Sequence, residues 1–494
     1  MTYSINKLFI DGHWVSSDND EGLQVINPAN GEAFATAPMA SARDAVKAVE
    51  AARRAFDNGI WPRLSPKERG DYLRRLGEVI ERRRSELVDL VVIESGFPRA
   101  MVDRVHVQSP IDVLSDIADR ILPAFSFMDP VNPNFGTSLT GQPQVNQGVV
   151  VREPVGVASL IIPYNAPIAA AIHKLSWALA AGCTIIIKPS PYTPLSVLIL
   201  GELVEEVGFP PGVINIITGD LDASIELTTN PGVDIISFTG SDAVGALVMA
   251  QAAPTLKKVV LELGGKSANI IFEDADLDRA ALEVMSNMVV NCGQGCLLLN
   301  RTLAHVSIHD ELIARVVTLL SSVKIGDPND STTLIGPLIS EKERSRIEGM
   351  IRSGEEEGAT IAFGGKRPTD LIDGYYLEPT LFVNVNNSMS IAQKEFFGPV
   401  GVIIPFKDEE DAIRIANDSP YGLNAGIFTT DTVKAFNVAK QIRCGNVNIN
   451  SSWGINADAP FGGYKRSGMG REGGGYGISE FLEYKFISWP TGKI

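Results

Sequence analysis

The sequence predicts an α/β protein with two α/β domains, the first of them a doubly wound unit with a parallel sheet. Between Val149 and Leu263, short β-branched runs alternate with stretches of helical periodicity. These runs are apolar throughout, as parallel strands covered on both faces should be. After Leu263 the alternation resumes with lower regularity, which indicates a second α/β domain.

The expected elements follow in chain order. An early amphipathic helix begins at Ser65, because Pro66 occupies the first helical position and Glu68 completes a capping box. The strands expected in the first domain are GVASLII, TIIIK, INIIT, DIISF and KKVVLEL, with helices between them, including helices from Pro194 and Ser241. In the second domain we expect a helix near Ala280, the strand TLAHVSI, a helix from Glu311, a helix capped at Ser340 in SEKE, and strands near Ala425 and Val447.

Two segments are predicted to be extended pieces outside both cores. They are 129–147, rich in Pro, Asn and Gly, and the apolar, aromatic tail FLEYKFISW, whose composition suggests pairing with another subunit. We therefore expect 1–128 with 148–261 to form the first domain and 262–460 the second. Residues 129–147 and 478–494 would form a small β extension.

Composition excludes several classes of protein. The formal charge of -16 and the pI near 4.9 argue against a nucleic-acid partner, since phosphate binding needs a basic surface. No run approaches a membrane span, and the N-terminus lacks the apolar core of a signal peptide. Four cysteines in 494 residues favour a reducing compartment, so we expect a cytoplasmic protein without a membrane partner.

One glycine pattern imitates a nucleotide-binding loop. Gly468, Gly470 and Gly473 spell G-x-G-x-x-G, but the run is expected to follow no strand and to open no helix. The dinucleotide fingerprint requires both, so this reading is rejected.

A second pattern imitates a zinc finger. Cys292 and Cys296 precede His305 and His309 with similar spacing. If the two histidines lie on one strand, they stand about 13 Å apart, too far to share a metal at about 2 Å per bond. No metal site is expected, and His13 and His106, which have no convergent partners, are expected to be structural.

Polar residues end several apolar runs, each with an ordinary structural explanation as well. Asn165 lies between two prolines that would aim its amide, although a plain turn fits equally, and Lys188 closes the strand TIII. Ser241 with Gly240 begins a helix and could bind an anion. Glu262 lies at an apolar strand end, where alternation could turn it to core or to solvent.

Together these stretches resemble the NAD(P)-dependent aldehyde dehydrogenase superfamily, in its hydrolytic branch. The motifs PYNAP, KPS, FTGS, LELGGK, GQGC, EFFGPV and PFGGYKRSGMGRE stand in the expected order across nearly the whole chain. The resemblance implies a Rossmann-type cofactor domain, a catalytic domain and a β oligomerisation extension. It also implies a homodimer or homotetramer.

The resemblance implies four catalytic residues. Cys296 would be the nucleophile, and the Asn165 amide with the Cys296 N–H would stabilise the oxyanion. Glu262 would be the base that hydrolyses the thioester, and Glu472 a proton relay. Cys292 would then be a neighbour of the nucleophile, either a small buried residue or a redox partner. Cys183 and Cys444 stand in apolar surroundings and are expected to be core residues.

The resemblance also implies a cofactor site. Lys188 would hold the adenosine ribose, Ser241 the pyrophosphate and Glu395 the nicotinamide ribose. The matching lining residues are Ile162, Pro163, Tyr164, Lys188, Ser190, Pro191, Gly240, Ser241, Leu263, Glu395 and Phe397. Pro191 replaces the glutamate of many NAD-preferring members, so the expected cofactor is NAD, with NADP possible.

The implied substrate tunnel is lined by Ala169, Ala170, His173, Gly295, Leu297, Trp453, Ile455 and Phe461. Small and apolar side chains there predict aliphatic, terpenoid or aromatic aldehydes in preference to semialdehydes or betaine aldehyde. Two alternatives stay open at this point. They are a coenzyme A acylating dehydrogenase and a catalytically retired, structural or binding member of the fold.

Overall fold

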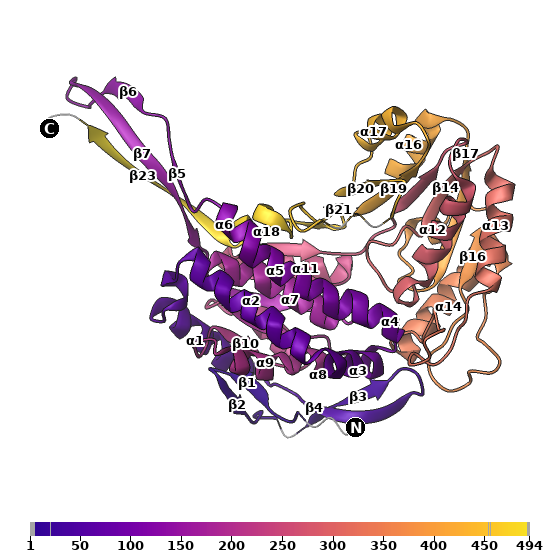
Figure 1. Cartoon of the computed structure of the whole chain (residues 1–494), viewed down its shortest axis with the longest axis horizontal. Helices are drawn as coiled ribbons and strands as arrows, with labels where there is room; N and C mark the ends of the chain where they lie inside the picture. The colour runs from indigo at the N-terminus through magenta and orange to yellow at the C-terminus, as the bar shows by residue number, and fades with distance from the viewer. Residues whose placement is uncertain (1–4, 20, 453, 455, 492–494) are drawn as a thin grey trace.

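The computed structural model describes residues 5–19, 21–452, 454 and 456–491. Figure 1 shows two α/β bodies and a β arm that projects from the first. The first body carries an eight-stranded sheet and the second a seven-stranded sheet. The α/β class predicted from the alternation of strands and helices is confirmed.

The centre of the first sheet is parallel and doubly wound. Its strands are β8 (Val157–Ile161), β9 (Thr184–Lys188), β10 (Ile214–Ile216), β11 (Ile235–Thr239) and β12 (Lys258–Glu262). They lie in the order β10-β9-β8-β11-β12, all parallel. The order reverses between β8 and β11, and open α/β sheets bind ligands at the carboxyl ends beside such a switch point.

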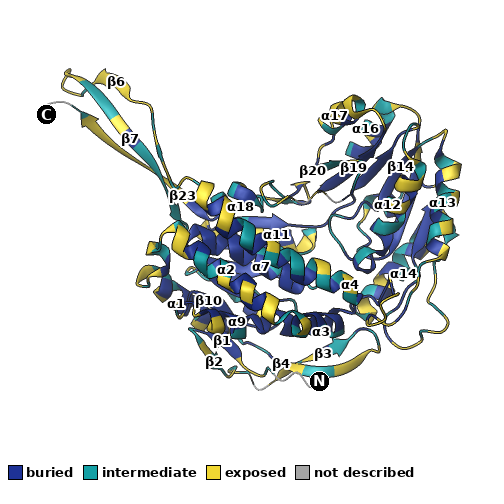
Figure 2. Cartoon of the chain, viewed as in Figure 1, coloured by how far each residue is buried: buried dark blue, intermediate teal, exposed yellow. Residues whose placement is uncertain are grey.

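Helices bury both faces of this sheet with their apolar sides, which explains the uniformly apolar strands. On one face Ile186 and Ile236 pack with α1 (Ala42–Asp57). On the other, Ile185 and Ile187 share a core with α7 (Pro167–Ala181), and α2 (Pro66–Arg82) packs against α7. Figure 2 shows the strands as buried. The predicted capping box of α2 is confirmed, with Ser65 and Glu68 in reciprocal hydrogen bonds.

The second sheet follows the order β15-β16-β17-β14-β13-β19-β20. Its strands are β13 (Ala268–Ile271), β14 (Arg301–His305), β15 (Thr360–Phe363), β16 (Thr380–Val383), β17 (Val400–Phe406), β19 (Asn424–Phe428) and β20 (Asn446–Ile449). Its main helices are α12 (Leu277–Val289), α13 (His309–Ser321), α14 (Glu341–Glu356), α16 (Glu409–Asn417) and α17 (Thr432–Ala439). The cap predicted at Ser340 is confirmed, because its side chain accepts from Glu343 N.

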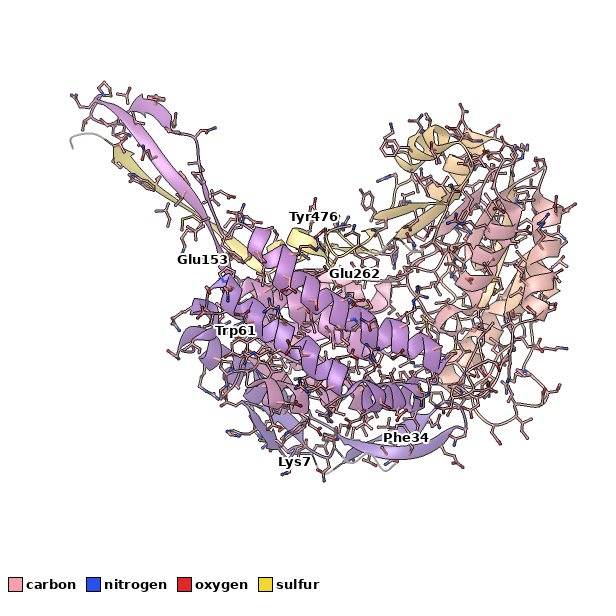
Figure 3. All side chains as sticks on the ribbon, in the orientation of Figure 1. Lys7, Phe34, Trp61, Glu153, Glu262 and Tyr476 are labelled. Carbon is pink, nitrogen blue, oxygen red and sulfur yellow. The ribbon has the colours of Figure 1, made fainter. Side chains whose placement is uncertain are left out.

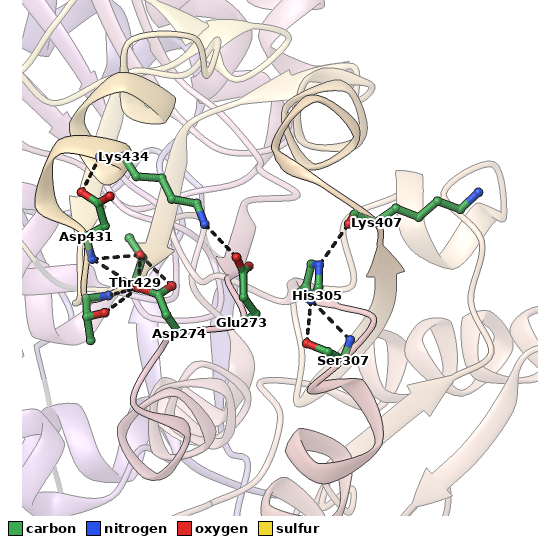
Figure 4. Close-up of polar contacts among 9 residues, drawn as sticks. Glu273, Asp274, His305, Ser307, Lys407, Thr429, Asp431 and Lys434 are labelled. Carbon is green, nitrogen blue, oxygen red and sulfur yellow. Dashed lines mark hydrogen bonds and ion pairs between the residues drawn. The ribbon is translucent and has the colours of Figure 1, made fainter.

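His305 and His309 do not lie on one strand, so the expectation that they share a strand was wrong. β14 ends at His305, and His309 already begins α13. His305 lies 2.7 Å from the Ser307 hydroxyl and 3.0 Å from the Lys407 carbonyl (Figure 4). No group of residues able to hold a metal occurs within the described ranges.

The arm contains β5 (Met128–Pro130), β6 (Asn134–Thr137), β7 (Pro143–Pro154) and β23 (Leu482–Thr491). The tail strand β23 pairs antiparallel with β7 along its whole length. We expected β23 to pair with another subunit. One edge of β23 instead pairs with β7 of the same chain. The side chains of Phe486, Ile487 and Trp489 stay exposed.

The glycine run also differs from expectation. It follows the short strand β22 (Gly468–Met469) and precedes α18 (Gly474–Glu480), so it does join a strand to a helix. However, β22 pairs antiparallel with β12 at the sheet edge and belongs to no βαβ unit. Among the described helices, none has the length and apolar character to cross a membrane.

Candidate active site

A cleft of about 850 Å³ lies at the carboxyl ends of the first sheet's parallel strands. It brings together residues distant in sequence, namely Asn165, Lys188, Ser241, Glu262, Cys296 and Glu395. All the predicted cofactor residues line it: Ile162, Pro163, Tyr164, Lys188, Ser190, Pro191, Gly240, Ser241, Leu263, Glu395 and Phe397.

The predicted substrate residues lie elsewhere. Ala169, Ala170, His173, Gly295, Leu297 and Phe461 are absent from the lining of this cleft, and Trp453 and Ile455 lie outside the described residues. Leu297 and Phe461 border a separate cavity of about 30 Å³. Asn424, Asn446, Asn448 and Asn456 line that cavity too, so its described wall is more polar than expected.

Cys296 is half-buried and lines the cleft, whereas the other three cysteines, all among the described residues, are buried. Burial, followed by the charges of Glu262 and Glu395, raises the pKa of its thiol well above the usual value. The sulfur is therefore a protonated thiol at neutral pH until a base or a ligand changes its surroundings. Its backbone is tightly enclosed, since a Cβ on Gly265 would stand 2.5 Å from the Cys296 carbonyl oxygen.

Asn165 follows β8 and precedes α7, where Pro167 begins the helix. Its Nδ2 donates to the Gln294 carbonyl at 2.9 Å, two residues before Cys296. One amide hydrogen is thus used to hold the side chain, and the second stays available to a ligand.

Glu262, labelled in Figure 3, ends β12. Its side chain is buried. Neither carboxyl oxygen has a hydrogen-bond partner among the described residues. Burial, reinforced by the charge of Glu472, raises its pKa well above the usual value. A buried, unpartnered carboxyl group with a raised pKa is suited to general acid–base work near neutral pH.

Glu472 lies behind Glu262 in a buried ion pair. Its carboxylate accepts from Lys174 Nζ at 2.6 Å, and the same ammonium donates to the Ser237 hydroxyl at 2.9 Å. The backbones of Glu472 and Phe461 form an antiparallel bridge. This bridge joins the C-terminal glycine motif to the edge of the site.

Two groups give the cleft a place for an anionic or hydroxylated ligand. Lys188 is buried, and burial lowers its pKa to about 8. Among the described residues, its Nζ donates one hydrogen bond, to the Pro189 carbonyl at 3.2 Å. Ser241 caps α11 (Asp242–Ala252) by accepting from Val244 N, which leaves its own O–H free to donate.

Glu395 is held against the segment that joins β12 to β13. Its Oε1 accepts from Gly265 N at 3.0 Å, and a Cβ on Gly264 would lie 2.3 Å from Oε2. Burial raises its pKa to about 7. The two glycines of LELGGK therefore allow Glu395 and Cys296 to approach the same segment.

Sequence reasoning missed several residues of the site. Lys174 is the one lysine in a mostly apolar helix, and this contrast could have marked it. Lys266 is buried with its ammonium 3.6 Å from the centre of the Phe396 ring. Asn291 gave no signal beyond its place in NCGQGC, because its partners come from distant elements.

Comparison with known proteins places this geometry in context. Residues 14–487 match the model of the aldehyde dehydrogenase family. The chain is 40% identical over 484 residues to betaine aldehyde dehydrogenase of Bacillus subtilis (strain 168), covering 97% of this chain and 96% of the relative. It is 41% identical over 490 residues to 3-succinoylsemialdehyde-pyridine dehydrogenase of Pseudomonas sp, covering 99% of each.

Solved structures are similar over nearly the same length. An aldehyde dehydrogenase of Mycobacterium tuberculosis complexed with NAD+ has a TM-score of 0.93 at 42% identity, covering 99% of both chains. Betaine aldehyde dehydrogenase of Staphylococcus aureus in complex with NAD+ has a TM-score of 0.93 at 37% identity, covering 98% of this chain and 94% of the neighbour.

Proposed function

The chain belongs to the aldehyde dehydrogenase family, and on this premise we propose that it oxidises an aldehyde to the free carboxylic acid with NAD+. The observation that supports hydrolysis most directly is the buried, unpartnered Glu262 carboxyl group in the same cleft as Cys296. Such a group can activate water against a thioester.

The first step is attack of the Cys296 sulfur on the aldehyde carbon, after the thiol proton has been transferred to a base. The product is a thiohemiacetal whose oxygen carries the developing negative charge. The free amide hydrogen of Asn165 and the Cys296 N–H would stabilise it, and removing one such donor typically costs about 3–4 kcal/mol of transition-state stabilisation.

NAD+, when bound, supplies the hydride acceptor that converts the thiohemiacetal into a thioester. Glu262 then takes a proton from water, and the hydroxide attacks the thioester carbon and releases Cys296 as the leaving group. The Lys174–Glu472 ion pair next to Glu262 offers a route by which that proton leaves the site.

The cleft fits NAD+ by the character of its walls. Leu221 and Ile225 from α10 (Leu221–Thr229), with Val244 and Leu247 from α11, form an apolar slot suited to adenine. Lys188 and Glu395 stand where ribose hydroxyls could meet an ammonium and a carboxylate. Pro191 lines the cleft without a carboxylate, which supports tolerance of the 2′-phosphate of NADP as well.

For the substrate, we propose apolar aliphatic, terpenoid or aromatic aldehydes. Small side chains along the first half of α7 support this class, as does the state of the cleft's arginine. Arg346 pairs with Glu343 at 2.8 Å and donates to the Phe396 carbonyl, so donors on both Nε and the guanidinium end already have partners within the chain. The relatives named for betaine aldehyde and for a semialdehyde provide the competing classes.

The test is NADH formation from a panel of aldehydes without coenzyme A. We expect the free acid as product and the largest kcat/KM for apolar aldehydes. Glu262→Gln should accumulate acylated enzyme after one burst of NADH, visible by mass spectrometry, whereas Cys296→Ala should give no burst. A strict requirement for coenzyme A would contradict the hydrolytic proposal, and a preference for betaine aldehyde or semialdehydes would contradict the substrate class.

We further propose that the arm mediates a homodimer or homotetramer, as its exposed Phe486, Ile487 and Trp489 suggest. Sedimentation analysis of the wild type against a triple Ser variant of these residues tests this. An unchanged mass would contradict it.

A further inference from the structure

The backbone just before the nucleophile is strained. Asn291 has φ 52° and ψ 30°, Cys292 has φ 55° and ψ 32°, and Gly293 follows with φ 71°. Side chains of L residues disfavour this left-handed region, although Asn tolerates it better than most. Two such residues before a glycine persist only where the surroundings hold them, and such strain gathers at functional sites.

The side chain of Asn291 holds this turn against the proposed oxyanion donor. Its Nδ2 donates to the Asn165 carbonyl at 2.8 Å and to the Gln294 carbonyl at 3.1 Å. The Gln294 carbonyl also accepts from Asn165 Nδ2. The two asparagines therefore share one acceptor, and Asn291 fixes both the backbone and the amide partner of Asn165.

His106 determines how Asn291 is oriented. Since both partners of Asn291 Nδ2 are carbonyl oxygens, Asn291 Oδ1 must face His106 Nε2, which lies 3.2 Å away. Oδ1 can only accept, so Nε2 carries the hydrogen. Burial lowers the pKa of His106 to about 4, which keeps the ring neutral.

The surroundings of His106 hold the ring in place. It lies in the π-helix η2 (Val102–Gln108), is 1% exposed and stacks on Phe97 at 5.5 Å between ring centres. π-Helical turns are rare and often occur at functional sites. Neither His106 nor Asn291 lines the cleft, so any effect on chemistry must pass through Asn165.

We propose that His106 and Asn291 are positioning residues, which hold the Asn165 amide so that its free hydrogen meets the oxyanion formed at Cys296. This inference rests on the proposed function. His106 orients Asn291, Asn291 anchors Asn165 and Gln294, and the Asn165 amide is left with one direction in which to donate.

The test compares His106→Leu with His106→Gln, whose side-chain amide can replace the Nε2–H donor. We expect His106→Leu to lower kcat by about 10- to 100-fold, the usual effect of a small misplacement at a reacting centre. His106→Gln should recover most of it. The NAD+ dissociation constant and the rate of Cys296 alkylation by iodoacetamide should stay unchanged, because neither needs the oxyanion donor. A general loss of structure would alter both.

A double-mutant cycle with Asn165→Ala separates positioning from other effects. In the Asn165→Ala background, His106→Leu should cause no further loss of kcat, because the group it positions is gone. If His106→Leu fails to fold, Asn291→Asp takes its place, since Asp keeps the left-handed preference and loses both donated hydrogen bonds.

Additive losses in the cycle, a wild-type kcat for His106→Leu, or a Gln variant as impaired as the Leu variant would each overturn the proposal. A wild-type kcat for Asn165→Ala alone would instead contradict the oxyanion assignment in the proposed function. The two failures are therefore distinguishable.

Discussion

Gly293→Ala probes how closely the segment before Cys296 is packed. Gly293 has φ 71°, and a Cβ added there would lie 2.1 Å from the Gly398 carbonyl carbon and 2.4 Å from Pro399 N. Carbon atoms in contact normally stand about 3.5–4.0 Å apart, so one backbone must move by more than about 1 Å.

Two costs add at this position. A left-handed Ala costs about 1–2 kcal/mol, and forcing an extra carbon into a packed site costs about 1–3 kcal/mol. We expect a total of about 2–5 kcal/mol. Gly208→Ala is the matched control, because Gly208 has φ 78° and no atom within 4 Å of an added Cβ. Gly208→Ala should show only the cost of the left-handed conformation.

The assay is the rate of unfolding in urea, because large chains often unfold irreversibly and a rate is then the defined quantity. Where the contact is lost in the transition state, Gly293→Ala should unfold about 10- to 100-fold faster than Gly208→Ala. Its kcat should also fall by about 100-fold, since the shift occurs three residues before Cys296. Equal unfolding rates for the two variants would refute the argument from close packing.

Three further predictions concern charge and hydrogen bonding. Glu472→Gln removes a charge that raises the pKa of Glu262, so the rise of kcat with pH should begin at lower pH, and a profile unchanged from wild type would contradict this. Alkylation of Cys296 by iodoacetamide in the free enzyme should be slow at pH 7 and should keep rising with pH through the range in which an ordinary thiol has already ionised, because burial and the charges of Glu262 and Glu395 raise its pKa. Glu262→Gln should accelerate this alkylation at neutral pH, and slower alkylation of the variant would show instead that Glu262 activates the thiol. Glu94→Ala should lower the free energy of unfolding by about 2–5 kcal/mol, because Glu94 accepts from Leu195 N at 2.6 Å and Ser196 N at 3.0 Å in a buried site; a loss below about 1 kcal/mol in urea denaturation would contradict it.

Periodicity and caps could be read from the sequence because they depend on neighbours along the chain. The capping box at Ser65 and the cap at Ser340 are set within one helical turn, and both are present. The parallel sheet followed from uniformly apolar runs, since only strands covered on both faces need them. Residues at the carboxyl ends of those strands then had to meet at one edge of the sheet.

Other features depend on which distant segments meet, and local patterns cannot report them. Alternation left the direction of Glu262 undecided, and only the packing of β12 against the C-terminal segment buries it. The tail strand showed an apolar pattern without showing its partner, which is β7 of the same chain. His309 was expected on the same strand as His305, because the local sequence does not show that β14 ends at His305.

The sequence by itself determined the α/β architecture. It also determined the motifs that contain Asn165, Glu262 and Cys296 and that follow the order typical of one family, because both features depend on spacing along the chain. Only the tertiary structure decided that His106 faces Asn291 and that Lys174 pairs with Glu472. These contacts join residues 185 and 298 positions apart, and such contacts form only when packing brings separate elements together.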